Sequence, residues 1–209
     1  MSHKARKTHW QNAWAEKNST NVSWYEETPS VSLDLINRHT GCEEPSIVDI
    51  GGGASFLIDR LMERRHGHMA VLDISGAALE VSKTRLGDKA EAVEWIVSDV
   101  LDWDPSMTFD VWHDRAAFHF LTAPEDQARY AAVVHKALKP GGLLVIGTFA
   151  IGGPEKCSGL AVRQHDAHSL AEVFGPGFAL LETRDHLHPT PFGTIQKFSF
   201  SAFHRSAER

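Results

Sequence analysis

The chain has 209 residues, a length that suits one α/β domain, and 42% of them are apolar, so extensive disorder is not expected. Its formal net charge of −6 argues against a general nucleic-acid binder, which carries a basic excess. No apolar run approaches the roughly 20 residues that a membrane-spanning helix needs. The first seven residues are basic, but no apolar stretch follows them, so a secretory signal is not predicted. Cys42 and Cys157 lie far apart, so we expect a cytoplasmic protein without a disulfide framework.

The polar segment 1–45 precedes the first predicted strand. Trp10 and Trp14 are four positions apart and would share one face of a helix. A second helix is predicted over residues 31–38, with Ser30 as its N-cap.

From residue 46 onward, short apolar strands alternate with helices. Strands are predicted over residues 47–50, 69–73, 92–97, 109–113 and 143–149, with helices over 55–65, 76–85 and 124–137. After a helix over 169–174, strands over 178–185 and 195–204 are joined by the turn 189–193 as an antiparallel hairpin. We therefore predict one α/β domain over 1–209, with its core at 46–209. Its sheet is doubly wound, mostly parallel and seven-stranded, with an antiparallel C-terminal hairpin and helices on both faces.

A glycine-rich loop follows the first predicted strand. Asp49 is followed by Gly51, Gly52 and Gly53, which let the backbone turn sharply and approach a ligand closely. Alone, this loop would indicate only a nucleotide-binding fold, because NAD enzymes use a similar one. It lacks the glycine that NAD enzymes need beside a pyrophosphate, and this favours a cofactor without phosphates.

Two acidic residues strengthen the prediction of a nucleoside site. Asp73, followed by Ile74, ends the second strand, where a carboxylate can accept hydrogen bonds from both ribose hydroxyls. Asp99 follows the third strand, where it can bind an adenine amino group while Val100 packs on the ring. The alternative is that Asp49 and Asp73 only cap neighbouring helices.

In this order, the glycine loop, Asp73, Asp99 and the turn at 139–142 resemble the class I S-adenosylmethionine-dependent methyltransferase family, over about residues 46 to 203. The resemblance implies that S-adenosylmethionine is the cofactor. It places Asp49 and the glycines beside the methionine part, Asp73 on the ribose and Asp99 with Val100 on the adenine.

Residues 112–120, at the end of the fourth strand, are the predicted acceptor region. His113 and His119 are candidate general bases, because histidine titrates near neutrality. Asp114 is assigned to both the cofactor site and the catalytic set. Alternatively, Asp114 forms a structural ion pair with Arg115, and His119 covers the following helix.

Two short resemblances leave the acceptor open between a small molecule and a protein lysine. Residues 114–116 look like a segment of thiopurine and related small-molecule methyltransferases, and also like a segment of a group of protein-lysine methyltransferases. Residues 23–26 are similar to a signature of that second group. A small-molecule acceptor is preferred, because little chain lies outside the core. A non-catalytic cofactor sensor is a third alternative.

Four residues are predicted to bind the acceptor. Trp24 and Tyr25 would close over the site as part of a lid, or else pack on the sheet edge as core. Cys157, in the loop after the fifth strand, could contact the acceptor or bind a soft metal. Arg163, in the same loop, could pair with an acidic acceptor. Histidines at 165, 168, 186 and 188 make zinc conceivable, but their spacing matches no recognised zinc pattern, and no metal is expected.

Overall fold

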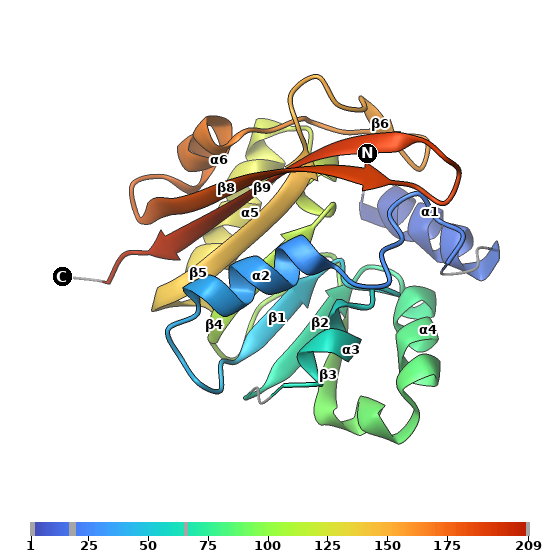
Figure 1. Cartoon of the computed structure of the whole chain (residues 1–209), viewed down its shortest axis with the longest axis horizontal. Helices are drawn as coiled ribbons and strands as arrows, with labels where there is room; N and C mark the ends of the chain where they lie inside the picture. The colour runs from blue at the N-terminus through green and yellow to red at the C-terminus, as the bar shows by residue number, and fades with distance from the viewer. Residues whose placement is uncertain (1–2, 17–19, 65–66, 208–209) are drawn as a thin grey trace.

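The computed structural model describes residues 3–16, 20–64 and 67–207, and these contain a seven-stranded sheet in the order β3-β2-β1-β4-β5-β9-β8 (Figure 1). The strands of this sheet are β1 (Ile47–Ile50), β2 (Met69–Asp73), β3 (Val93–Val97), β4 (Phe109–Arg115), β5 (Leu138–Phe149), β8 (Phe178–Pro189) and β9 (Ile195–Arg205). The pairs from β3 to β5 are parallel, whereas β9 is antiparallel to both β5 and β8. The predicted fold class and closing hairpin are confirmed.

Helices cover both faces of the sheet, as predicted (Figure 1). The described helices are α1 (His3–Glu16), α2 (Ser30–His39), α3 (Leu57–Leu61), α4 (Gly76–Leu86), α5 (Pro124–Ala137) and α6 (Ala167–Phe174), with short 3₁₀ turns η1 (Gly87–Ala92) and η2 (Phe118–Phe120). Helices α5 and α6 bury their apolar side chains with Val48 and Ile50 of β1. Helices α2, α3 and α4 pack on the opposite face with Ile47. Alternate residues of β1 thus serve two cores.

Several boundaries differ from the predicted ones for local reasons. Helix α3 begins at Leu57, because the Ser55 hydroxyl accepts a hydrogen bond from the Leu57 N–H, and ends in a tighter turn in which the Arg64 N–H donates to the Leu61 carbonyl. Pro29, rather than Ser30, occupies the N-cap of α2, with no side-chain cap.

The loop after β5 also differs from prediction, because it contains a small hairpin, β6 (Lys156–Cys157) with β7 (Leu160–Ala161). Helix α1 lies beside α4, at the edge of the sheet where β1, β2 and β3 end (Figure 1). Within the described ranges, no helix is both long and apolar enough to cross a bilayer.

Candidate active site

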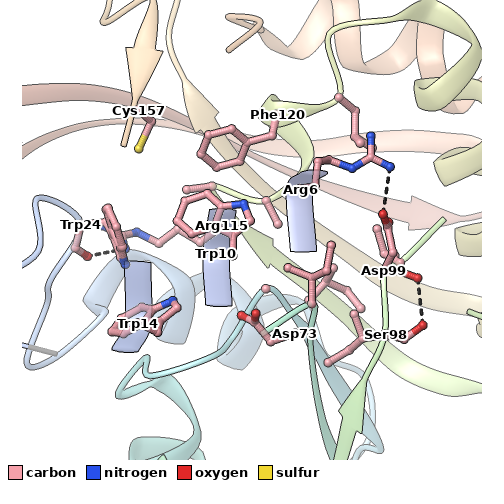
Figure 2. A pocket seen from close by; sticks show the side chains of 18 residues that line it. Arg6, Trp10, Trp14, Trp24, Asp73, Ser98, Asp99, Arg115, Phe120 and Cys157 are labelled. Carbon is pink, nitrogen blue, oxygen red and sulfur yellow. Dashed lines mark hydrogen bonds and ion pairs between the residues drawn. The ribbon is translucent and has the colours of Figure 1, made fainter. Parts of the chain in front are cut away.

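A pocket lies at the carboxyl ends of β1, β2, β3 and β4, with α1 over it (Figure 2). Its lining residues are Arg6, Trp10, Trp14, Trp24, Ile50, Gly51, Leu72, Asp73, Ile74, Ser98, Asp99, Val100, Arg115, Ala116, Ala117, Phe120, Leu121 and Cys157. Ligands of parallel α/β folds bind at this edge of the sheet. Gly51 has a φ of +66°, and a Cβ there would lie 2.7 Å from the Ala117 Cβ, so the loop needs glycine at this position.

Asp73 places a buried carboxylate at the end of β2. Its Oδ1 accepts a hydrogen bond of 2.8 Å from the Ser75 N–H. Burial, with a smaller contribution from the charge of Asp49, raises the pKa of Asp73 to about 7, although backbone hydrogen bonds from Ser75 and Ile74 act in the opposite direction. A ligand that donates hydrogen bonds, such as a pair of adjacent hydroxyls, would favour the charged form.

Asp99 follows β3 and lies in the same pocket as Asp73 (Figure 2). Its Oδ1 accepts a hydrogen bond from the Leu101 N–H at 3.0 Å, and its Oδ2 lies 2.8 Å from Nη2 of Arg6 in α1. A second guanidinium nitrogen of Arg6 lies 3.3 Å from Asp126. These ion pairs hold α1 across the adenine end of the predicted nucleoside site.

A smaller pocket adjoins the larger one, and its lining residues include Tyr25, Asp49, Gly52 and His113. Both pockets share Trp14, Trp24, Gly51 and Arg115 among their lining residues, so they form two ends of one site. The remaining predicted loop residue, Gly53, supports this site from below, because a Cβ there would lie 2.6 Å from Oδ2 of Asp73.

Arg115 places a positive charge at the centre of the site. Its Nη1 donates to the Trp24 carbonyl at 2.8 Å, and its Nη2 lies 3.2 Å from Oε1 of Glu26. Burial lowers the pKa of Arg115, whereas Glu26 and Cys157 raise it. Burial alone would raise the pKa of Glu26, but a hydrogen bond from His188 and the charge of Arg115 bring it below its ordinary value. The partner of Arg115 is therefore Glu26, not Asp114.

The structure gives His113 and Asp114 buried hydrogen-bond partners, which argues against the prediction that they act on the acceptor. Nδ1 of His113 lies 2.7 Å from Oδ1 of Asp49 and Nε2 lies 2.8 Å from the Ser32 hydroxyl, so both ring nitrogens are engaged. Asp114 is fully buried and lines neither described pocket. It accepts hydrogen bonds from the Phe118 N–H and, at 2.6 Å, from the Tyr130 hydroxyl. Asp114 therefore stabilises the strand end from within the core, whereas His113 reaches the smaller pocket with both ring nitrogens already engaged.

His119 and Arg163 are also placed away from the pocket. His119 is fully buried between Phe120 and Phe149, with ring centroids 4.5 and 4.8 Å away. Burial lowers its pKa to about 3, and the charges of His165 and Arg115 add to this, so it is a poor base at neutral pH. The Arg163 guanidinium lies 3.4 Å from Oε1 of Gln127, and neither residue lines a described pocket.

The other predicted substrate residues do reach the site. Trp24 lines both pockets, Tyr25 lines the smaller one, and Cys157 lines the larger one from the β6 strand (Figure 2). Arg6 and Phe120 were not predicted as site residues. Phe120 belonged to a stretch that the sequence singled out, but no sequence pattern pairs Arg6 with Asp99, which lies 93 positions away.

Comparison with known proteins identifies the chain's relatives. Residues 47–142 match a family model described as a methyltransferase domain. The chain is 28% identical over 112 residues to malonyl-[acyl-carrier protein] O-methyltransferase 1 of Ilyobacter polytropus, covering 53% of this chain and 40% of that protein. It is 30% identical over 108 residues to the ubiquinone/menaquinone biosynthesis C-methyltransferase UbiE of a Ruegeria species, covering 50% and 42% respectively. The chain thus spans about two fifths of the length of these curated relatives.

A solved structure extends the likeness across the whole fold. The N-methyltransferase NodS of Bradyrhizobium japonicum, in complex with S-adenosylhomocysteine, superposes with a TM-score of 0.69 at 14% identity. The match covers 93% of this chain and 97% of that one. At this identity, the likeness establishes the fold.

Proposed function

We propose that the chain, whose residues 47–142 match a methyltransferase-domain model, is a class I S-adenosylmethionine-dependent methyltransferase that transfers a methyl group to a small-molecule acceptor by in-line displacement. One observation carries the proposal: the Gly51 backbone and the carboxylates of Asp73 and Asp99 line a single pocket at the carboxyl ends of three adjacent strands.

The residues of this site suit S-adenosylmethionine. The buried Asp73 carboxylate would accept hydrogen bonds from the ribose hydroxyls, and Asp99 with Val100 would bind the adenine. The loop from Gly51 to Gly53, with Asp49 behind it, would lie along the methionine part. When bound, this cofactor supplies a methyl group on a sulfonium. The residues around it hold the acceptor in line and exclude water.

We assign the acceptor to the aromatic end of the larger pocket. Trp10, Trp24 and Phe120 form an apolar wall there, with centroids of Trp10 and Phe120 5.1 Å apart, and Arg115 and Cys157 supply polar groups. Helix α1 and residues 22–25 then act as the lid over this end. The curated relatives are named as a malonyl-[acyl-carrier protein] O-methyltransferase and a ubiquinone/menaquinone biosynthesis C-methyltransferase, and neither name specifies a protein lysine as the acceptor.

A protein-lysine acceptor is the alternative, based on residues 23–26. In that stretch, Trp24 and Glu26 are turned inward, onto Arg115 and the pocket, rather than outward to a protein partner. This favours the small molecule. The net charge of −6 argues against nucleic acid as a partner, and the presence of only two cysteines, far apart in the sequence, favours a cytoplasmic location.

Calorimetry tests the cofactor first. We expect saturable binding of S-adenosylhomocysteine by the wild type, at least tenfold weaker binding by Asp73→Ala, and unchanged binding by the matched surface variant Asp88→Ala. Tight binding of NAD without binding of S-adenosylhomocysteine would overturn the proposal. Incubation with methyl-labelled cofactor and a fractionated lysate then tests the acceptor. Label in the low-molecular-mass fraction supports a small molecule, label in one protein band supports the alternative, and cofactor binding without labelling favours a sensor.

A further inference from the structure

Three potential metal ligands from distant parts of the chain converge beside the pocket. Oε1 of Glu26, just before α2, lies 3.0 Å from Nε2 of His186 and 3.1 Å from Nδ1 of His188, both on β8. Residues two apart on a strand share one face, so β8 presents both imidazoles together. We propose that Glu26, His186 and His188 form a binding site for a divalent transition metal ion, with zinc as the best-suited ion.

The tautomer of His188 gives the first argument. Its Nε2 lies 2.8 Å from the Ser23 carbonyl, which can only accept, so the proton of a neutral His188 is on Nε2. Nδ1 then carries a lone pair, yet it faces a carboxylate oxygen at 3.1 Å. Two acceptors at this distance need a cation between them. His188 is only 1% exposed, and a metal ion at this point would serve both acceptors without a proton on Nδ1.

Geometry and the surroundings give the second argument. Zinc with ligands at 2.0–2.1 Å holds tetrahedral neighbours about 3.3 Å apart, within a few tenths of an ångström of the two nitrogen–oxygen distances here. All three ligand atoms lie within 4.8 Å of one another. The Ser23 carbonyl on the far nitrogen of His188 is the outer partner that fixes the tautomer of metal-bound histidines. The side chain of His186 is 24% exposed, which leaves an entry path and room for water.

Arg115 is the charge that opposes a metal here, because its Nη2 lies 3.2 Å from the same Glu26 oxygen. A carboxylate offers about four lone-pair directions, so Glu26 can serve both the guanidinium and the ion. Nη1 of Arg115 is also anchored independently on the Trp24 carbonyl. The ion would thus tie segment 23–26, which carries Trp24 of the pocket wall, to β8. Its binding does not depend on the proposed methyl transfer.

Zinc titration of the chelator-treated 209-residue chain tests this site. The background is Cys42→Ser, because Cys42 is an exposed thiol that would bind zinc adventitiously. We expect one zinc ion to bind per chain and to raise the Tm. When Co²⁺ replaces zinc, we expect the visible absorption that is typical of a four- or five-coordinate ion. His186→Ala and His188→Ala should weaken binding at least tenfold. His168→Ala, an exposed histidine paired with Glu172, is the matched control and should bind normally.

His186 is partly exposed, so His186→Ala keeps the test valid if His188→Ala does not fold. No stoichiometric binding by the parent chain at submillimolar zinc would overturn the proposal, and so would equal binding by folded His186→Ala. NMR that finds both ring nitrogens of His188 protonated in the presence of zinc would also overturn it, in favour of an imidazolium.

Discussion

Nη2 of Arg6 lies 2.8 Å from Oδ2 of Asp99, although 93 positions separate the two residues in the chain. The pair joins α1 to the end of β3 across the larger pocket (Figure 2). The second oxygen of Asp99 is turned to the Leu101 N–H. An adenine amino group that binds Asp99 would therefore meet Oδ2, the oxygen that Arg6 holds. In this arrangement, α1 covers the site and Arg6 occupies an oxygen that the proposed cofactor would contact.

We expect Arg6→Ala to accelerate cofactor association. If the pair contributes about 0.2–1 kcal/mol, the range of surface ion pairs, its loss should raise the association rate about 1.4- to fivefold. Stopped-flow tryptophan fluorescence from Trp10 and Trp14 measures this rate. Added salt should mimic the substitution in the wild type. Arg38→Ala, which removes an exposed pair with Asp34, is the control. An unchanged or slower rate in Arg6→Ala would show that the pair does not oppose entry.

The sequence was sufficient to predict the fold because its signals are local. A short apolar strand such as 47–50, followed by glycines at 51 and 53, can be recognised from neighbouring residues alone. Asp73 and Asp99 follow parallel strands, and the carboxyl ends of such strands lie at one edge of the sheet. The predicted cofactor residues therefore lie at or beneath the pocket, with the exception of Asp114.

The acceptor side could not be predicted in the same way. His113, Asp114 and His119 are consecutive or nearly so, and sequence does not tell which of them face the core. That was decided by partners distant in the chain: Ser32 for His113, Tyr130 for Asp114 and Phe149 for His119. Pocket residues that were not predicted, such as Arg6, lie on segments whose position depends on tertiary contacts.

The raised pKa of Asp73, about 7, predicts pH-dependent cofactor binding. Only the ionised carboxylate accepts hydrogen bonds from both ribose hydroxyls, so the affinity for S-adenosylhomocysteine should rise about tenfold from pH 6 to pH 8. Asp73→Asn should bind more weakly and lose this dependence. Calorimetry at several pH values measures both. A flat profile in the wild type, or the same slope in Asp73→Asn, would contradict the ribose assignment.

The same group should affect stability in the opposite sense. The folded-state pKa of Asp73 lies above the unfolded value of 3.8, so its contribution is fully present below about pH 4 and is lost as the pH rises through 7. Without cofactor, Asp73→Asn should therefore raise the Tm at pH 8, by about 2–4 °C for each kcal/mol that the substitution adds to the free energy of unfolding. The rise at pH 5 should be smaller. Thermal unfolding by circular dichroism provides the measurement. Equal shifts at both pH values would point to packing instead.

The buried chain Asp49–His113–Ser32 predicts a structural role for His113. Replacing it by leucine would leave the Asp49 carboxylate buried without this partner, which should cost about 2–4 kcal/mol in the free energy of unfolding. Ser32→Ala removes a hydroxyl contact only and should cost about 1 kcal/mol. Urea unfolding compares the two. If His113→Leu were as stable as the wild type but inactive, the result would contradict a structural role and support His113 as the general base.

Tyr130 and Asp114 provide a last, pH-dependent test of the core assignment. Burial raises the pKa of Asp114 to about 6, and the 2.6 Å hydrogen bond from the Tyr130 hydroxyl opposes that rise. Tyr130→Phe removes the donor, so the folded-state pKa should increase further. Below the unfolded pKa the carboxyl is neutral in both states, and the added loss of stability appears only as the pH rises through 6.

Tyr130→Phe should therefore destabilise the protein by about 1.5–3 kcal/mol at pH 8 and by less at pH 5, in urea unfolding at each pH. Tyr25→Phe is the matched control, because Tyr25 is the only other tyrosine of the chain and its ring stacks edge-on against Phe56 at the pocket rather than in the core. Its effect should not vary with pH. A pH-independent loss in Tyr130→Phe would mean that Asp114 stays neutral in the folded protein. Its carboxyl group would then only form hydrogen bonds at the end of β4, without carrying a charge.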